Sequence, residues 1–163
     1  MNGGEEIGIR RLSGIEEVRE CARLMANSEP WITLGRTYAD SLKIVGDPSR
    51  EVHVAARGDA LVGFIILNMR GAFVGYIQTV CIAPEWRGKG IGSLLIKFAE
   101  ERILRETPNV FMCVSSFNVE AQRLYERLGY EVVGELRDYI VAGHSEILLR
   151  KTVAPLTEFK KKS

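Results

Sequence analysis

The feature that most constrains the fold of this chain is the segment Arg87–Ser93, in which every second residue is a glycine. A strand-like run at 73–82 comes before it, and residues 91–103 after it place apolar side chains at helical spacing. A short β-branched and aromatic run at 110–114 follows. A strand, a helix and a further strand in this order predict a right-handed crossover, with the two strands parallel and adjacent.

The rest of the pattern predicts one α/β domain with a mixed, mostly antiparallel central sheet and helices on both of its faces. Ser13 and Glu16 have the spacing of a capping box that begins a first helix. Its expected buried stripe is Ile15, Val18, Ala22 and Met25. Further strands are expected at 7–12, 51–57, 60–69, 130–136 and 145–151, and further helices from about 37 and at 119–128. We assign residues 1–153 to a single domain and 154–163 to a basic, solvated tail.

The composition restricts the classes of function. The chain has 163 residues, 46% of them hydrophobic, and 22 Lys+Arg against 21 Asp+Glu, so its formal charge is +1. This balance predicts no nucleic-acid partner, because nucleic-acid binding relies on excess positive charge. The longest apolar stretch, 61–67, is too short to cross a membrane, and residues 1–11 lack the apolar core of a secretory signal. We therefore expect a cytoplasmic protein without membrane association, whose 3 cysteines are reduced and bind no metal.

The glycine segment has the character of an anion-binding site at a helix N-terminus. Without side chains at alternate positions, successive backbone N–H groups can converge on one anion, and the helix dipole favours negative charge there. Arg87 and Lys89 add positive charge, so the expected ligand is a pyrophosphate. The P-loop motif does not fit, and Ser93 stands where the dinucleotide fingerprint requires its third glycine. The alternative is a glycine-rich turn that only packs the helix on the sheet.

A second segment, Asn118–Tyr130, strengthens the functional interpretation. Asn118 and Tyr125 are seven positions apart, so they lie on nearly the same face of a helix. The structural interpretation makes Asn118 the N-cap, Tyr125 a member of the buried stripe and Gly129 the C-terminal cap. Both interpretations can hold at once.

Together these segments resemble a known family. The acyl-CoA signature of the GCN5-related N-acetyltransferases (GNAT) is similar to the run Val80-Cys81-Ile82-Ala83-Pro84-Glu85-Trp86-Arg87-Gly88-Lys89-Gly90-Ile91-Gly92. Their second motif, N-x-x-A-x-x-L-Y-x-x-L-G-[FY], resembles residues 118–130. The expected order of elements, β-α-α-β-β-β-α-β-α-β-β, is similar to that family's fold from about residue 7 to 152. The resemblance implies a GNAT-like acyl-CoA N-acyltransferase fold, acetyl-CoA as cosubstrate, and acetyl transfer to a primary amine of a small molecule or a peptide N-terminus.

The resemblance also implies roles for individual residues. The pantetheine arm would pair with the strand backbone at Val80, Cys81 and Ile82. The pyrophosphate would be wrapped by Arg87, Gly88, Lys89, Gly90, Ile91, Gly92 and Ser93. Asn118 would contact the pantetheine or the acceptor, and Tyr125 would be the general acid that protonates the departing thiolate. A phenol with a pKa near 10 can do so for a thiol with a pKa near 8.5 only when it is held within hydrogen-bond reach.

The group that accepts the amine proton is not implied by the resemblance. Family members that acetylate ribosomal-protein N-termini carry a Glu five residues before the motif's Asn, where this chain has Cys113. A thiol in an apolar strand is expected to be core rather than catalytic. A primary amine with a pKa near 10 is only about one part in a thousand neutral at pH 7, so a base or a water chain is needed. The candidates are Glu29, Asp40, Glu85 and His144, for each of which a solvated surface position is the alternative.

Acceptor recognition is expected in the segments 28–40 and 138–144, which the cofactor motifs leave free. The candidate side chains are Glu29, Trp31, Tyr38, Asp40 and His144. Carboxylates suit a cationic amine and aromatic faces suit its carbon frame, so a small amine or peptide N-terminus is expected to fit better than a phosphorylated acceptor. The alternative is that Trp31 and Tyr38 only anchor two helices to the sheet.

Other hypotheses stay open at this stage. Direct transfer in a ternary complex, with a main-chain N–H at 80–82 polarising the thioester, competes with an acyl-Cys intermediate at Cys81 or Cys113. The chain could instead be a non-catalytic acyl-CoA-binding or sensing module, although such a module needs neither Asn118 nor Tyr125. Acylation of a tRNA-linked amine is disfavoured by the charge. A homodimer is compatible with the sequence.

Overall fold

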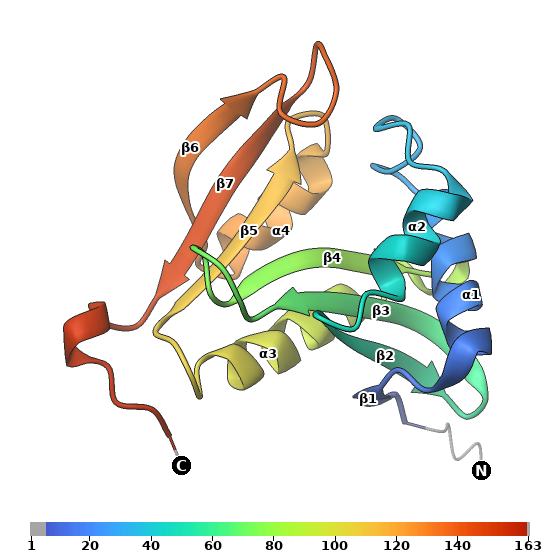
Figure 1. The fold of residues 1–163 in the computed structure, drawn as a ribbon, viewed down its shortest axis with the longest axis horizontal. Helices are drawn as coiled ribbons and strands as arrows, with labels where there is room; N and C mark the ends of the chain where they lie inside the picture. The colour runs from blue at the N-terminus through green and yellow to red at the C-terminus, as the bar shows by residue number, and fades with distance from the viewer. Residues whose placement is uncertain (1–5, 163) are drawn as a thin grey trace.

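The computed structural model describes residues 6–162, whose fold Figure 1 shows. A seven-stranded sheet runs in the order β1-β2-β3-β4-β5-β7-β6. Its strands are β1 (Gly8–Arg11), β2 (Glu51–Arg57), β3 (Ala60–Asn68), β4 (Tyr76–Ile82), β5 (Asn109–Ser115), β6 (Glu131–Arg137) and β7 (Ser145–Thr152). The helices are α1 (Gly14–Ala26), α2 (Tyr38–Val45), α3 (Ile91–Ile103) and α4 (Val119–Arg127), with short 3₁₀ turns η1 (Pro84–Trp86) and η2 (Leu156–Glu158). Among the strands of the described residues, only β4 and β5 pair in parallel, which confirms the predicted mixed, mostly antiparallel sheet and its crossover.

Helices cover both faces of the sheet, and the central strand β3 contributes to a core on each face. Phe64 and Ile66 pack with α1 and α2, whereas Ile65 and Leu67 pack with α3. Consecutive side chains of a strand point to opposite faces, so a strand covered on both faces must be apolar throughout. The unbroken burial of residues 62–67 meets this demand and accounts for the longest apolar stretch of the sequence. Among residues 6–162, no helix has the length and apolar character needed to cross a membrane.

The first helix begins where the sequence predicts, but its cap is different. The backbone N–H of Ser13 donates to Glu17 Oε2 at 2.7 Å, and the Ser13 hydroxyl makes no capping bond. Glu16, the expected partner, pairs with an arginine one turn along the helix. The buried stripe begins one turn later than predicted and includes Cys21, while Ile15 is 58% exposed. The capping-box prediction was therefore wrong, and the carboxylate that accepts the Ser13 N–H is one residue further along than expected.

β4 contains a bulge at the point where it leaves its parallel neighbour. The register between β3 and β4 skips Gln78, which is therefore an extra residue in β4. On its other side, β4 pairs with β5 only at Tyr76 and Ile77. A bulge bends a strand and increases its local twist. Residues 78–82 consequently have no strand partner on the β5 side, and the two strands diverge (Figure 1).

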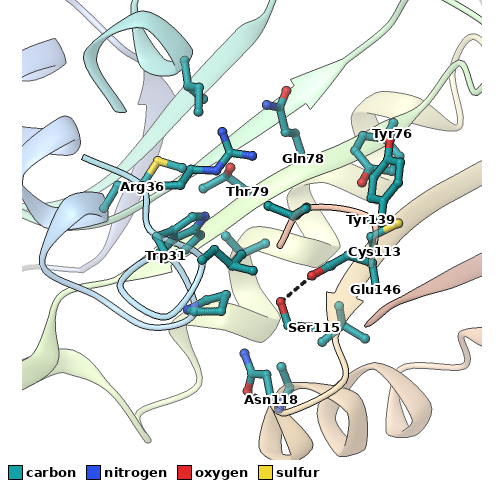
Figure 2. A pocket seen from close by; sticks show the side chains of 18 of the residues that line it. Trp31, Arg36, Tyr76, Gln78, Thr79, Cys113, Ser115, Asn118, Tyr139 and Glu146 are labelled. Atoms are coloured by element: carbon teal, nitrogen blue, oxygen red, sulfur yellow. Dashed lines mark hydrogen bonds between the residues drawn. The ribbon is translucent and has the colours of Figure 1, made fainter. Parts of the chain in front are cut away.

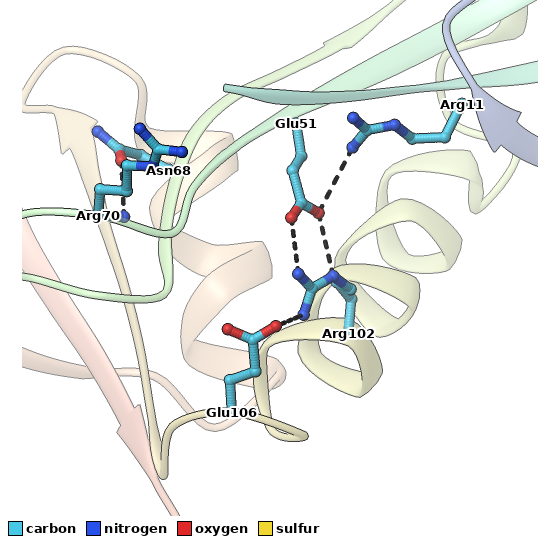
Figure 3. A network of polar contacts seen from close by, with 6 residues as sticks. All are labelled: Arg11, Glu51, Asn68, Arg70, Arg102 and Glu106. Carbon is cyan, nitrogen blue, oxygen red and sulfur yellow. Dashed lines mark hydrogen bonds and ion pairs between the residues drawn. The ribbon is translucent and has the colours of Figure 1, made fainter. Parts of the chain in front are cut away.

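An ion network holds the C-terminal half of α3 against the start of β2 (Figure 3). Glu51 accepts hydrogen bonds from Arg102 Nη2 at 2.6 Å and from Arg102 Nε at 3.0 Å. Arg102 also donates to Glu106 at 2.7 Å, and Arg11 of β1 lies 3.6 Å from Glu51. Two parallel N–H···O bonds give such a pair a fixed geometry. The network therefore fixes one end of α3, and the glycine segment begins the other end.

The two ends of the chain bear on the expectations in different ways. Residues 154–162 are mostly exposed, but they contain η2, and the backbone N–H of Lys162 donates to the carbonyl of Arg105 at 3.1 Å. At the other end, residues 1–5 lie outside the described part of the chain. The absence of a secretory signal thus stays a prediction.

Gly75 offers a test of the contact that joins β4 and β5 before the two strands diverge. Its carbonyl accepts the N–H of Phe111 at 2.9 Å, its φ is +88°, and a Cβ there would lie 2.5 Å from the carbonyl oxygen of Asn109. Gly71 is a matched control, because its φ is also +88° but no atom lies within 4 Å of its Cβ position. We expect Gly71→Ala to lower the free energy of unfolding by about 1–2 kcal/mol, the cost of the left-handed conformation. Gly75→Ala should lose about 2–5 kcal/mol, because overpacking adds about 1–3 kcal/mol. Urea unfolding followed by circular dichroism measures both, and equal losses would contradict the prediction.

Candidate active site

The divergence of β4 and β5 opens a cavity of about 350 Å³ (Figure 2). From β4 it receives Tyr76 and the consecutive residues 78–80, and from β5 it receives residues 113–115. The bulge at Gln78 interrupts the alternation of β4 beside this cavity, whereas residues 113–115 of β5 border it without a bulge. The other walls come from the segment between α1 and α2, the start of α4, and the β6–β7 loop.

Helix α4 and its N-cap bring both polar residues of the second motif to this cavity. Asn118 is the N-cap, since its Oδ1 accepts the backbone N–H of Ala121 at 3.3 Å, and its Nδ2 remains a donor. Tyr125 lies two turns further along, and burial raises the pKa of its phenol to about 12. Within residues 6–162 the Tyr125 hydroxyl has no hydrogen-bond partner. It therefore keeps its proton at neutral pH and can donate it to a ligand.

The glycine segment ends in a set of free backbone N–H groups. Gly90 is the N-cap of α3 with a left-handed φ of +79°, and Gly88 has a φ of +71°. Residues with a Cβ rarely adopt this conformation, which explains glycine at both positions. The first helical bond joins Leu94 N–H to the Gly90 carbonyl at 3.1 Å, so the N–H groups of residues 91–93 have no acceptor within the helix. Such a group of donors suits an anion.

The two cations of this segment are engaged with the protein itself. Arg87 Nε donates to the Ile82 carbonyl at 3.2 Å and Arg87 Nη2 to Ser28 Oγ at 3.3 Å. Lys89 Nζ lies 4.8 Å from the centre of the Trp86 ring, in cation–π contact. The backbone N–H groups, rather than these side chains, thus form the centre of the predicted anion site, and the cations add charge around it.

Burial makes both candidate thiols poor nucleophiles. Cys81 is 2% exposed, and burial raises the pKa of its thiol to about 12, so only roughly one in 10⁵ is ionised at pH 7. Cys113 lines the cavity, where burial raises the pKa of its thiol and a hydrogen bond with Tyr76 acts in the opposite direction. The thiolate is the reactive form of cysteine. These shifts oppose the acyl-Cys route.

Among the side chains expected to recognise the acceptor, Trp31 lines the cavity and is 9% exposed. Glu29 lies outside the lining and accepts from the Thr33 N–H at 3.1 Å and the Thr33 hydroxyl at 3.0 Å. Asp40 closes a capping box with Thr37 at the start of α2. Both carboxylates are thus used by local backbone and hydroxyl groups, which the sequence analysis did not weigh against a binding role.

The remaining candidates also lie outside the lining of the cavity. Tyr38 is 38% exposed on α2, and Glu85 is exposed on η1. His144 packs edge-on against Phe117, with ring centres 4.8 Å apart. None of these three lines the cavity, so the site does not include them as acceptor ligands or as the base.

The cavity contains a carboxylate that the sequence analysis missed. Glu146 of β7 is 5% exposed and lies opposite Ser115 of β5 in the sheet register. The Ser115 hydroxyl donates to Glu146 Oε1 at 2.6 Å (Figure 2), and Oε2 has no hydrogen-bond partner within residues 6–162. Burial raises the pKa of Glu146, and the charge of Arg36, a second cavity residue that was missed, acts in the opposite direction. A buried carboxylate with one free oxygen can accept a proton from a ligand.

Comparison with known proteins points to one family. The profile described as "Acetyltransferase (GNAT) family" matches residues 15–130. A protein of Arabidopsis thaliana named GCN5-related N-acetyltransferase 6, chloroplastic, is 26% identical over 133 residues, or 76% of this chain and 45% of that protein. The aminoalkylphosphonate N-acetyltransferase of Salmonella typhimurium is 31% identical over 91 residues, or 52% of this chain and 59% of that protein. The chain thus spans about half the length of these curated relatives.

A solved structure shows the same fold. The aminoglycoside 6'-N-acetyltransferase in complex with coenzyme A superposes with a TM-score of 0.72 at 18% identity, covering 90% of this chain and 97% of that one. At this identity the likeness concerns the fold alone. It confirms the fold class that the order of elements predicts.

Proposed function

The chain belongs to the GCN5-related N-acetyltransferase (GNAT) family, and on this premise we propose that it transfers the acetyl group of acetyl-CoA directly to a primary amine. The observation that carries the proposal is the unpaired edge of β4 at residues 78–82, beside a cavity that contains Tyr125. A free strand edge binds an extended ligand through its backbone, and the amides of a pantetheine arm can pair with it in this way. The N–H groups of residues 91–93 lie close by in the chain and would receive the pyrophosphate.

Two groups of the cavity would carry the protons of this reaction. The amine nitrogen attacks the thioester carbonyl carbon, the C–S bond breaks, and an N-acetyl amine and a thiol are formed. Glu146 accepts the proton that the nitrogen loses, and Tyr125 gives a proton to the departing sulfur. A binding or sensing module needs neither group, so their presence in one cavity favours an enzyme over the non-catalytic alternative.

Acetyl-CoA should stabilise the fold through the N-terminus of α3. At about 100 times its Kd it adds roughly 2.7 kcal/mol to the stability, which a thermal scan detects. Gly92→Val should lose most of this shift, because a branched side chain would stand where the phosphates approach. We expect the fold to tolerate the change, since a Cβ at position 92 meets only Leu124 at 3.8 Å. Gly134→Val, on β6 with no atom within 4 Å of its Cβ position, is the matched control and should keep the shift. A full shift in Gly92→Val would remove the phosphate assignment.

Tyr125→Phe should lower kcat by about 10²–10⁴ and retain acetyl-CoA binding, as expected for the loss of one positioned general acid. Because the pKa of this phenol is about 12, its titration should leave the wild-type kcat unchanged below about pH 11. Tyr38→Phe, on the outer side of α2, is the control. If kcat of Tyr125→Phe stays within about threefold of wild type, another group or a water supplies the proton.

Glu146→Gln should lower kcat/KM at pH 7 by about 10²–10⁴, because the side chain still accepts the Ser115 hydrogen bond but no longer takes a proton. The deficit should narrow as the pH approaches the amine's own pKa of about 10, since the free amine needs no base to become neutral. Glu135→Gln, an exposed residue of β6, is the control. A deficit that stays constant between about pH 7 and pH 10 would show that Glu146 only positions the acceptor.

A further inference from the structure

The half-buried side chain of Arg36 has no hydrogen-bond or ion-pair partner among residues 6–162. Among residues 6–162 three arginines are half-buried, namely Arg36, Arg50 and Arg102. Arg102 pairs with two carboxylates, and Arg50 Nε lies 3.6 Å from one. The side chain of Arg36, by contrast, makes no hydrogen bond or ion pair in this part of the chain. A guanidinium that lines a cavity with its donors unused suits a ligand of negative charge.

The backbone places this guanidinium at the cavity. The N–H of Arg36 donates to the carbonyl of Trp31 at 3.0 Å, which closes a turn in the segment between α1 and α2. Figure 2 shows the side chain extending over the cavity beside Thr79, whereas Glu146 enters from β7. The two charges are not joined by an ion pair, yet the charge of Arg36 lowers the pKa of Glu146. A positive and a negative group therefore share one cavity with space between them.

We propose, on the basis of the function above, that the acceptor is a small amine that also carries a carboxylate or a phosphonate. Arg36 binds the anionic group, and the amine nitrogen lies toward Glu146. A guanidinium presents paired donors in one plane, which match two oxygens of such a group. Polyamines are disfavoured, because a second ammonium would face Arg36 and Arg50. The proposal revises the expectation from the sequence that an acceptor with a phosphorus oxyanion fits less well than a simple amine.

The size of the cavity limits the acceptor further. About 350 Å³ must hold the acceptor together with the thioester end of the cofactor. This is at the lower end of the range for small-molecule sites. An amino acid or a short aminoalkylphosphonate fits such a space, and the anionic group of either can lie at Arg36.

The test compares amines that differ in the group at their far end. The anionic set contains the common amino acids, β-alanine and aminoethylphosphonate, while propylamine is the neutral acceptor and putrescine the cationic one. CoA release is measured for each. We expect kcat/KM for at least one anionic acceptor to exceed that for propylamine and putrescine by about tenfold or more. The ratio between carboxylates and the phosphonate then identifies which oxyanion the site prefers.

Variants of Arg36 separate an anion site from general damage. Arg36→Gln should lower kcat/KM for the preferred anionic acceptor by about 10- to 100-fold relative to propylamine, mainly through KM. Any effect of the lost charge on the pKa of Glu146 should act on both acceptors alike. Arg36→Lys should recover part of the loss, because it restores the charge but not the paired donors. Arg23→Gln, an exposed residue of α1 outside the cavity, is the matched control.

The outcomes distinguish this inference from the proposed function. The inference is overturned if kcat/KM for propylamine or putrescine equals that for the best anionic amine. It is also overturned if Arg36→Gln lowers kcat/KM equally for neutral and anionic acceptors. In both cases the proposed function stands. Thermal stabilisation of the protein–CoA complex by the anionic set is a second measurement that needs no turnover. Stabilisation that depends on Arg36 without CoA release from any acceptor supports the anion site and contradicts the proposed function. If no anionic amine is turned over and none stabilises the protein–CoA complex, the inference is overturned.

Discussion

The parting of β4 from β5 is the constraint on which the candidate site depends. Backbone groups of a sheet normally satisfy each other, and an unpaired edge in the middle of a sheet must find water or a ligand instead. Here the bulge at Gln78 bends β4 away while its other edge stays paired with β3. The strands remain joined at their beginnings, where the Gly75 carbonyl holds the N–H of Phe111. The same break therefore provides both the free edge and the space beside it.

Burial within this space acts on the proposed acid and the proposed base in the same direction, with different consequences. It raises the pKa of Tyr125, so the phenol keeps its proton at neutral pH and can donate it to a ligand within hydrogen-bond reach. It also raises the pKa of Glu146, which strengthens the affinity of that carboxylate for a proton. The hydrogen bond from Ser115 occupies one oxygen and leaves the other free. One physical cause thus prepares a donor and an acceptor for the two ends of the same reaction.

The sequence predicts those parts of the fold and site that depend on local signals. Periodicity reveals the strands and helices, alternate glycines mark the start of α3, and the seven-residue step from Asn118 to Tyr125 places both at one cavity. Glu146 was not predicted as a site residue, because its place in the cavity depends on facing Ser115, 31 positions away. Strand register of this kind cannot be read from one sequence. Arg36 was not predicted for a related reason. Nothing in the neighbouring sequence shows that the turn closed on Trp31 places Arg36 at the cavity. The sequence also indicated Asp40 as a candidate, whose carboxylate closes the capping box of α2 instead of lining the cavity.

The limited pairing between β4 and β5 has a consequence for how such a site can change. Arg36 and Trp31 belong with α1, α2 and β4, whereas Glu146 and Tyr125 belong with β5, β7 and α4. These two parts of the sheet are joined in register only at Tyr76 and Ile77. The distance between the Arg36 and Glu146 side chains therefore depends on the angle at which β4 and β5 diverge. That angle is supported by α3, whose apolar side chains share one core with residues from both parts. Substitutions in this core, far from Arg36 and Glu146, would therefore change the length of the acceptor that fits between them. They would do so without replacing any residue that binds the acceptor.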